Sequence, residues 1–446
     1  SYDIAKKLYG IENYIKTNNL DRQSVIDEQE KLYNTDKEDA ELTHENTLPA
    51  SIDVGDFDPE KISYADLLKE GITREHYILK HSKPKADIEL EEYNAQTPAI
   101  DAMRTALFNL PDIDTSIWTD LSIWNRSFAH RIKTGSILVE GGLQPYKYRF
   151  ILQKNKTAPL LILFPSIAEG IKSHHSVVFA KLFYDFGYSV VIEGSSFHWE
   201  FVKSMPKGYT PGLPKEDALK LAEITSEILK QLESRYQYKP CRKTVLGTSF
   251  GAITALFLAS NEYKKNTLNI NKYIAINPPI ELIYAMKEVD KSSEEWQKNP
   301  NNLKERVALI SAKILNLWNK RNNPEFKLTS LPFNDYEAKL ITGFVMHQKL
   351  SDLMMTMENV PMDKKTDFYK NMNNINYQNY MEKYFYTGNV LDYDNLNYDT
   401  SLYSIADYLQ NNDNYKIYHS LDDYLVNSRQ LNILKKYTGN KSVYMS

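Results

Sequence analysis

The chain has 446 residues, of which 42% are hydrophobic and 25% are charged, and its formal net charge is −4. This composition is typical of a globular protein with a large core, and the acidic balance excludes the basic surface that binds nucleic acid. The longest apolar run, "APLLILFPSIA" from Ala158, is shorter than the about 18 residues of a membrane-spanning helix, so we expect no membrane span. A single cysteine, Cys241, excludes a disulfide framework and a cysteine-based zinc site.

Residues 1–130 are polar and rich in Asp, Glu and Lys, with short helical patterns separated by breaks such as "NTLPASIDVGDFDPEKIS" at 46–63. We predict a mostly helical N-terminal extension over this range. Because the chain begins with Ser1 rather than Met, we expect that a preceding piece, such as a signal peptide, has been removed.

Strand patterns begin at 136–152, where two β-rich runs flank Gly141 and Gly142 and predict a hairpin. Strand-sized apolar runs then alternate with helical patterns, such as the amphipathic stretch 217–236. The further predicted strands are 160–164, 188–194, 244–246 and 272–276. Because parallel strands need crossover connections, this alternation predicts an α/β fold with a mostly parallel sheet, whose first part covers 131–279.

The stretch 280–412 lacks convincing strands and is rich in Asn, Tyr and Met. Helical patterns at 303–319, 336–357 and 401–410 predict an inserted helical lid over 280–412. A stripe of Met and Leu within 344–357 fits either an acyl pocket or ordinary core packing. Strand patterns return at 415–419 and 442–445, so 413–446 is expected to supply the last strands of the same sheet.

The pentapeptide "GTSFG" at 247–251 joins a predicted strand to a predicted helix. A serine hydroxyl is a weak nucleophile, so catalysis needs it exposed on a sharp turn beside free backbone N–H groups. Gly247 and Gly251 permit such a turn around Ser249, and the N–H of Phe250 would face a developing oxyanion. The alternative is a turn in which Ser249 caps the helix. The preceding strand and following helix favour a nucleophile elbow with Ser249 as the catalytic nucleophile.

From about residue 136 to its end, the sequence therefore resembles the α/β-hydrolases. The resemblance implies the α/β-hydrolase fold, and a second oxyanion donor in the loop after the third strand. "FPSIAEG" at 164–170 matches that loop, and the N–H groups of Ser166 and Ile167 are the candidate donors. The loop departs from the Gly-rich form of the family, since Gly170 is its only glycine. An ordinary turn is the alternative.

The resemblance also implies an acid after the seventh strand and a histidine after the last strand. "YHSLDDYLV" at 418–426 stands in the place of the acid. Asp423 fits best because Tyr-Leu-Val follows it, whereas Asp422 is displaced by one residue. No histidine follows Asp423, so we expect the catalytic histidine beyond Ser446. His419 lies four residues before Asp423 and is poorly placed to stand between the serine and the acid.

Three further histidines are candidates for the rim of a substrate pocket. His174 and His175 begin the predicted helix after the loop at 164–170, with exposed polar residues as the alternative, and His198 follows a predicted strand end. The string "DYDNLNYD" at 392–399 is similar to a calcium loop, but it lacks the required glycine and has Leu396 at a ligand position. We therefore expect no metal ion and no cofactor.

These residues predict a serine hydrolase that cleaves a small-molecule or lipid-like carboxylic ester through an acyl-enzyme on Ser249. Two alternatives stay open: acyl transfer to an alcohol, and a catalytically inactive α/β-hydrolase fold that binds a lipid or a protein. The stretch 187–204 is similar to an envelope-associated group of bacterial α/β-hydrolases with a long N-terminal extension. That similarity implies a protein of the periplasm or cell envelope, with a cytoplasmic location as the alternative, and the sequence does not indicate an oligomeric state.

Overall fold

The computed structural model describes residues 96–108, 117, 118, 120, 126–297, 303–320, 330–370, 375–385, 393–420, 423–438 and 443–445. The chain forms two compact units. The helical unit comprises the described residues among 81–111 and 289–345, and the sheet unit comprises those among 112–288 and 346–446. Most of the extension predicted over 1–130 lies outside the described residues. The predicted division at 131, 280 and 413 stays a prediction.

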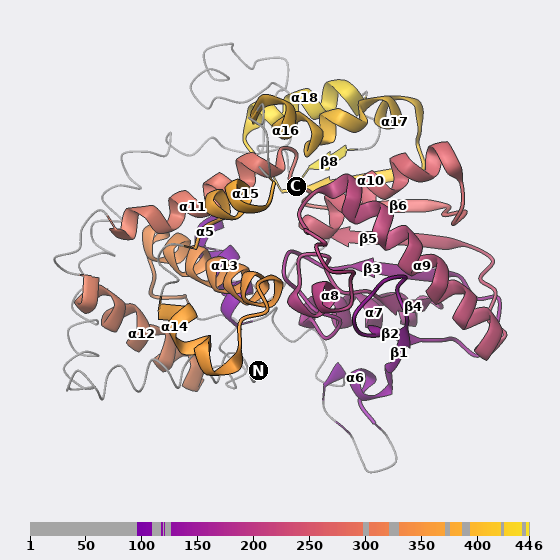
Figure 1. The fold of residues 1–446 in the computed structure, drawn as a ribbon, viewed down its shortest axis with the longest axis horizontal. Coiled ribbons are helices and arrows are strands. Elements are labelled where there is room, and N and C mark those ends of the chain that lie inside the picture. Colours follow the sequence, from indigo (N-terminus) through magenta and orange to yellow (C-terminus); the bar gives the residue numbers. More distant parts are fainter. Residues whose placement is uncertain are drawn as a thin grey trace, which may run out of the picture. The chain divides into compact units, whose positions relative to one another are not determined.

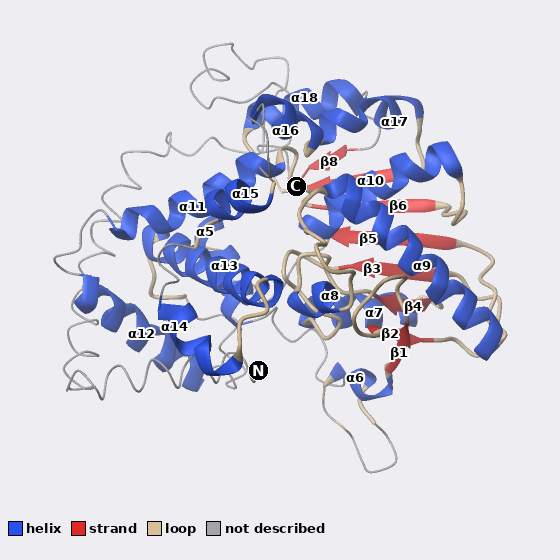
Figure 2. Ribbon diagram, viewed as in Figure 1, coloured by secondary structure: helices blue, strands red, loops and turns tan. Residues whose placement is uncertain are grey.

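The strands of the sheet unit form one eight-stranded mixed sheet, drawn in red in Figure 2. They are β1 (Lys133–Ile137), β2 (Tyr146–Ile151), β3 (Leu160–Phe164), β4 (Ser189–Ile192), β5 (Lys243–Thr248), β6 (Lys272–Ile276), β7 (Tyr415–His419) and β8 (Val443–Met445). Their order is β1-β2-β4-β3-β5-β6-β7-β8, with β2 antiparallel to both neighbours and all later pairs parallel. This is the strand order of the α/β-hydrolase fold, so the predicted fold class is confirmed.

The central strands are apolar because helices cover a parallel sheet on both faces. Every residue of β3 and of β4 is buried, whereas the edge strand β1 has one buried residue among five. In the sheet unit, α7 (His174–Asp185) packs against β3 and β4. α10 (Phe250–Lys265) packs against β5, β6 and α9 (Pro214–Tyr236). In Figure 1, α9 and α10 lie in front of the sheet.

Local sequence sets several helix ends. Ser173 and Asn376 accept a backbone N–H at the starts of α7 and α15, and Pro214 occupies the first turn of α9. The other helices of this unit, some shared with the helical unit, are α6 (Phe128–Arg131), α8 (Trp199–Lys203), α11 (Leu282–Gln297), α13 (Asp335–Met357), α14 (Lys365–Lys370), α15 (Tyr377–Tyr384), α16 (Tyr393–Asp399), α17 (Ala406–Asn411) and α18 (Ser428–Thr438), with 3-10 turns η6 (Met362–Lys364) and η8 (Leu402–Ile405). Within the described ranges, no helix is both long and apolar enough to cross a membrane.

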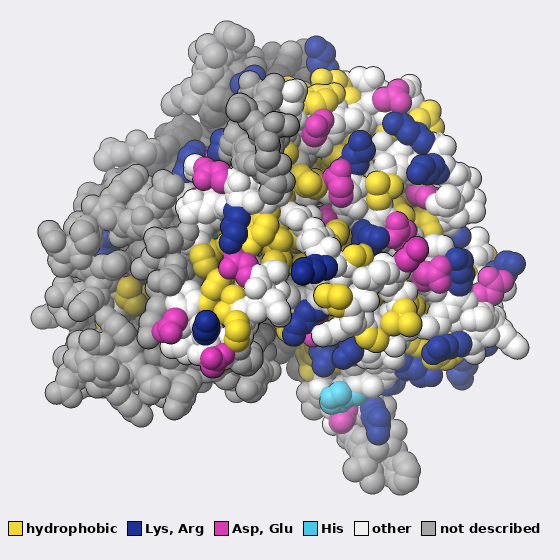
Figure 3. Space-filling view, in the orientation of Figure 1, with side chains coloured by type: hydrophobic (Ala, Val, Ile, Leu, Met, Phe, Trp, Pro, Cys, Tyr) yellow, Lys and Arg dark blue, Asp and Glu magenta, His cyan; other side chains and the backbone are white. Residues whose placement is uncertain are grey.

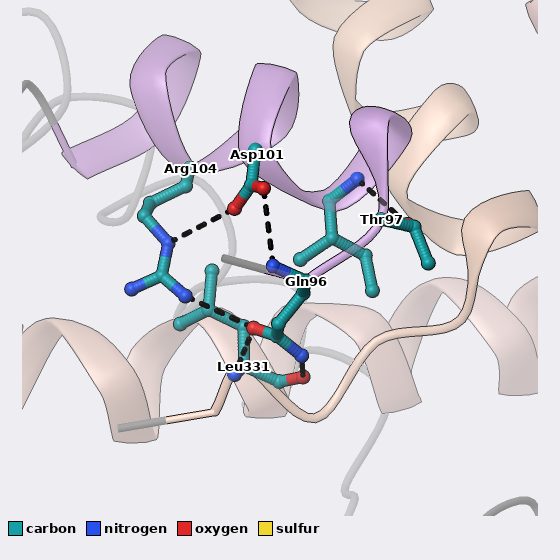
Figure 4. Close-up of polar contacts among 6 residues, drawn as sticks. Gln96, Thr97, Asp101, Arg104 and Leu331 are labelled. Carbon is teal, nitrogen blue, oxygen red and sulfur yellow. Dashed lines mark hydrogen bonds and ion pairs between the residues drawn. The ribbon is translucent and has the colours of Figure 1, made fainter. Parts of the chain in front are cut away.

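The helical unit packs α5 (Pro98–Phe108) with α12 (Leu303–Lys320) and the segment that leads into α13. Figure 4 shows how the start of α5 joins Leu331: the Gln96 amide donates to the Leu331 carbonyl oxygen at 3.1 Å and accepts the Leu331 N–H at 2.7 Å. Arg104 donates to the same Gln96 side-chain oxygen at 2.9 Å. A buried ion pair joins the Lys313 Nζ to Glu337 at 2.9 Å.

Most predicted elements of the described range agree with the structure. The hairpin predicted at 136–152 is the antiparallel pair β1–β2, and the strand predicted at 415–419 is β7. The helices predicted at 303–319 and 336–357 are α12 and α13. Several boundaries differ. The strand predicted at 188–194 ends at Ile192, the strand predicted at 244–246 is β5 (Lys243–Thr248), and the helix predicted at 401–410 is a 3-10 turn followed by α17.

Candidate active site

Ser249 lies between β5 and α10 in a strained backbone conformation, with φ 51° and ψ −117°. A positive φ costs a residue with a Cβ about 1–3 kcal/mol and persists only where the surrounding structure imposes it. Ser249 is the N-cap residue of α10, but its side chain makes no hydrogen bond that caps the helix, which disfavours the interpretation as an ordinary capping serine. The bend leaves this side chain partly exposed.

The glycines on either side of Ser249 allow three backbone segments to touch. A Cβ on Gly247 would lie 2.2 Å from the carbonyl oxygen of Gly251. A Cβ on Gly251 would lie 2.2 Å from the carbonyl oxygen of Phe164, the last residue of β3. The strand, the helix and the loop after β3 therefore approach too closely for any other residue at these two positions.

The first turn of α10 supplies the N–H group beside Ser249. The N–H of Ala252 donates to the Ser249 carbonyl oxygen at 2.9 Å, so the N–H of Phe250 precedes the first hydrogen bond of the helix. The buried Phe250 ring contacts Phe197 at a centroid distance of 5.7 Å. Phe197 in turn contacts Tyr377 and Tyr380 of α15 at 6.1 and 5.3 Å. The first turn of α10 therefore packs against an aromatic cluster.

The loop after β3, residues 165–170, is attached to the elbow. The hydroxyl groups of Ser166 and Thr248 are hydrogen-bonded at 3.0 Å. The N–H of Glu169 donates to the Ser166 carbonyl oxygen at 3.1 Å, which closes a turn around Ile167 and Ala168. Ala168 has a positive φ of 56° in that turn. The candidate donors Ser166 and Ile167 thus lie in a tight turn that is hydrogen-bonded to Thr248, the residue before Ser249.

A buried carboxylate holds the far end of this loop. The Nδ1 of His175 lies 3.1 Å from the Oε1 of Glu169, and the N–H of Ser195 donates to the Glu169 carbonyl oxygen at 3.0 Å. Burial raises the pKa of Glu169, but the hydrogen bond and charge of His175, with smaller contributions from Lys349 and Ser173, hold it below the ordinary value. The sequence singled out His175 but not Glu169, because only the folded loop brings the pair together.

Backbone hydrogen bonds connect the carboxyl ends of β5, β6 and β7, and they involve residues just beyond these strands. The N–H of Ser249 donates to the Ile276 carbonyl oxygen at 2.8 Å, and the N–H of Asn277 donates to the Tyr418 carbonyl oxygen at 2.7 Å. Since neighbouring strands are about 4.8 Å apart, the end of β7 lies about 10 Å from the end of β5. A loop from β7 is therefore at the edge where Ser249 lies.

Asp423 follows β7 in that loop. Its Oδ1 accepts the N–H of Leu425 at 2.9 Å, and its Oδ2 lies 3.9 Å from the Nε2 of His419. Burial raises the pKa of Asp423 above its ordinary value, although the charge of His419 acts in the opposite direction. Both ring nitrogens of the buried His419 contact backbone carbonyl oxygens, of Ser420 at 2.8 Å and of Pro278 at 3.3 Å. His419 is therefore packed against the loop that carries Asp423, and both of its ring nitrogens lie near protein oxygens. Asp422 lies outside the described residues.

The other histidine candidates differ in their surroundings. His174 stacks on Trp118, with ring centroids 4.4 Å apart. His198 accepts the Glu200 N–H at the start of α8 and packs against Gly170. Of the three, His198 lines a cavity of about 190 Å³, whose lining includes neither Ser249 nor Asp423.

The part of the chain that the structure describes holds no cluster of three or more His, Cys, Asp or Glu residues that could bind a metal ion. The segment that is similar to a calcium loop instead forms α16 over Tyr393–Asp399. The helical backbone does not fold around an ion as a calcium loop does.

No protein-family model matches the chain, and no curated protein matches it. Among solved structures, it is similar to a Pyrococcus furiosus esterase at 14% identity and a TM-score of 0.37, over 71% of this chain and 80% of the esterase. In another crystal form, the match covers 41% of this chain and 66% of the esterase, just under two thirds of its length. A Pyrococcus horikoshii acylaminoacyl peptidase matches at 11% identity and a TM-score of 0.38, over 71% of this chain and 36% of the peptidase. These similarities are weak, and the fold assignment depends on the strand order.

Proposed function

We propose that the protein is a serine hydrolase that cleaves a carboxylic ester through an acyl-enzyme on Ser249. The observation that carries this proposal is the strained backbone of Ser249 between two glycines that admit no side chain. A capping serine needs no such strain, whereas a nucleophile needs a bend that exposes its hydroxyl beside unpaired N–H groups.

In the proposed mechanism, the Oγ of Ser249 attacks the ester carbonyl carbon and loses its proton to a histidine, which is expected after the last strand. The N–H of Phe250 and an N–H from Ser166 or Ile167 stabilise the oxyanion. The tetrahedral intermediate expels the alcohol, which takes the proton from the histidine. Water then attacks the acyl-enzyme and releases the acid. Asp423 holds the histidine, and the positive imidazolium would favour its ionised form despite the burial.

The Met and Leu stripe of α13 bears on the substrate class. The Leu350 and Leu353 side chains of the Met and Leu stripe are fully buried, which favours core packing for this part of α13. We therefore propose a small-molecule or lipid-like ester and leave the acyl length to a substrate series. An exported location in the periplasm or cell envelope is likewise a proposal, and cell fractionation tests it.

A series of p-nitrophenyl esters with acetyl, butyryl and octanoyl groups tests the activity of the full-length protein. We expect hydrolysis that Ser249→Ala lowers by about 1,000-fold or more. Ser234→Ala, which removes an exposed hydroxyl from α9, is the matched control and should keep the wild-type rate. A Ser249→Ala rate equal to that of wild type would exclude this nucleophile. Adding glycerol as an acceptor separates hydrolysis from acyl transfer, because transfer gives a new ester instead of the free acid.

A further inference from the structure

The cavity of about 190 Å³ beside α8 is formed by the start of β2, the loop after β3, the end of β4 and α8 itself. The hydroxyl of Tyr146 accepts the N–H of Gly194 at 2.9 Å, which places the cavity at the carboxyl end of β4. Ligands of open α/β sheets bind outside the carboxyl ends of the strands. The cavity therefore lies where such a sheet binds ligands, although Ser249 does not line it.

Tyr146 brings a buried hydrogen-bond donor to this cavity. Only 2% of the residue is exposed, and its hydroxyl oxygen already accepts the Gly194 N–H. Burial, with the negative charge of Glu193, raises the pKa of Tyr146 well above its ordinary value, so the phenol keeps its proton. Among the described residues, no acceptor for this proton is found. The hydroxyl can therefore donate to a ligand in the cavity.

His198 is a second side chain of the lining. Its Nδ1 accepts the N–H of Glu200 at 3.2 Å and lies 3.9 Å from the Glu200 Oε2. The ring is fixed against the loop after β3, because a Cβ on Gly170 would lie 2.9 Å from its Cε1. His198 thus lines the cavity with its ring held against Gly170.

Two ammonium groups add positive charge. Lys147 and Lys203 both line the cavity, and the Lys203 Nζ lies 5.0 Å from the ring centroid of Trp199, which limits its movement. The only carboxylate of the lining belongs to Glu200, whose side chain is 52% exposed. On the face shown in Figure 3, several Lys and Arg side chains lie near the position of α8, with hydrophobic and other side chains between them. The lining therefore offers donors and a net positive charge.

We propose that this cavity binds a small anionic group, a carboxylate or a phosphate. Such a group accepts a hydrogen bond from Tyr146 and complements the charges of Lys147 and Lys203. The volume is below the about 300–1,000 Å³ of sites that enclose a drug-sized ligand, so one anionic group with few further atoms fits. The anion is either a free small molecule or the charged end of a larger ligand.

Isothermal titration of the full-length protein with inorganic phosphate and with acetate, at constant ionic strength in chloride, tests this site. We expect saturable binding of at least one anion by the wild type. Lys203→Gln should weaken it about fivefold, as should Tyr146→Phe, which removes only the hydroxyl. Lys230→Gln, the same charge change on an exposed part of α9, is the control and should bind as wild type does. Ser249→Ala should also bind normally, so failure of the proposed hydrolase leaves this result intact.

Two outcomes would overturn the proposal: no saturable binding of either anion, or an equal loss in Lys203→Gln and Lys230→Gln. A comparison of p-nitrophenyl acetate with the p-nitrophenyl half-ester of glutaric acid identifies the source of the anion. A preference for the charged ester that Lys203→Gln abolishes identifies the anion as part of the substrate. Anion binding without that preference identifies a free small anion.

Discussion

Gly247 and Gly251 differ from Gly187 in what a side chain would meet. Gly187 has a φ of 86°, but a Cβ there would meet nothing within 4 Å. We predict that Gly247→Ala lowers the free energy of unfolding by about 3 kcal/mol, because backbone would have to move. Gly187→Ala should cost about 1 kcal/mol, because only its φ is unfavourable. Denaturant unfolding measures both, and equal losses would contradict the close approach at the elbow.

Glu193 at the end of β4 is a buried acid that the proposed reaction does not use. Its Oε1 accepts the Thr225 hydroxyl at 2.8 Å, its Oε2 has no partner, and burial raises its pKa to about 8. The unfolded chain loses this proton near pH 4.5, whereas the folded protein keeps it to about pH 8. As the pH rises from 4.5 to about 8, the ionisation of Glu193 in the unfolded chain therefore lowers the free energy of unfolding by about 1.4 kcal/mol per pH unit.

Glu193→Gln removes this ionisation and keeps the acceptor for Thr225. We predict that the variant and wild type have similar stability at pH 5, and that the variant is more stable by a few kcal/mol at pH 8. Denaturant unfolding across this pH range measures the difference. Glu227→Gln, on an exposed part of α9, should show no such trend. A constant difference between Glu193→Gln and wild type would show that the carboxyl group does not titrate in this way.

At the scale of elements, the loop after β3 is held at both ends. Ser166 joins it to β5, and Glu169 joins it to α7 and to the segment after β4. Glu169→Gln should slow acylation of Ser249 about tenfold, because a loop that moves presents its N–H groups poorly to the oxyanion. The reaction rate with a fluorophosphonate measures this effect. Glu223→Gln on α9 is the control. Equal rates for Glu169→Gln and wild type would contradict the role of Glu169 in positioning the loop after β3.

The pairing of Glu169 with His175 also predicts how the stability of the fold changes with pH. The folded protein holds the pKa of Glu169 below its ordinary value, so ionised Glu169 contributes stability above about pH 4.5. This contribution is lost as the pH falls through the folded pKa. We predict that the stability difference between wild type and Glu169→Gln narrows as the pH falls below 4.5. Unfolding curves at pH 7 and at acidic pH test it, and an unchanged difference would contradict the ionised pair.

The sequence predicts elements best where a single local pattern decides them. β3 and β7 are visible as short apolar or alternating runs, and the elbow is visible because "GTSFG" needs its glycines for local geometry. β1 is predicted only through its hairpin partner, because its own residues are mostly exposed.

Contacts between distant segments cannot be read from local patterns. The pairing of Glu169 with His175 depends on a turn closed by backbone hydrogen bonds. The cavity at Tyr146 forms only when four segments of the chain come together. The joining of Gln96 to Leu331 in the helical unit likewise depends on segments far apart in the sequence. Site residues that act through such contacts require the structure.

At the scale of the whole molecule, the sheet combines segments that are far apart in the chain. β7 pairs with β6 across the long helical stretch, with Ala275 opposite Ile417. We predict that Ile417→Ala lowers the free energy of unfolding by about 3 kcal/mol, since Ile417 is fully buried. Tyr418→Ala, on the exposed side of β7, should cost less than about 1 kcal/mol. Similar losses in the two variants, measured by denaturant unfolding, would contradict this burial pattern.

The central claim is that the fold presents Ser249 as a nucleophile. Mass spectrometry of the full-length protein after reaction with a fluorophosphonate tests it most directly. We predict one adduct on the peptide that contains Ser249, none in Ser249→Ala, and normal labelling of Ser234→Ala. An unlabelled wild type, or labelling of Ser249→Ala at the wild-type rate, would contradict it.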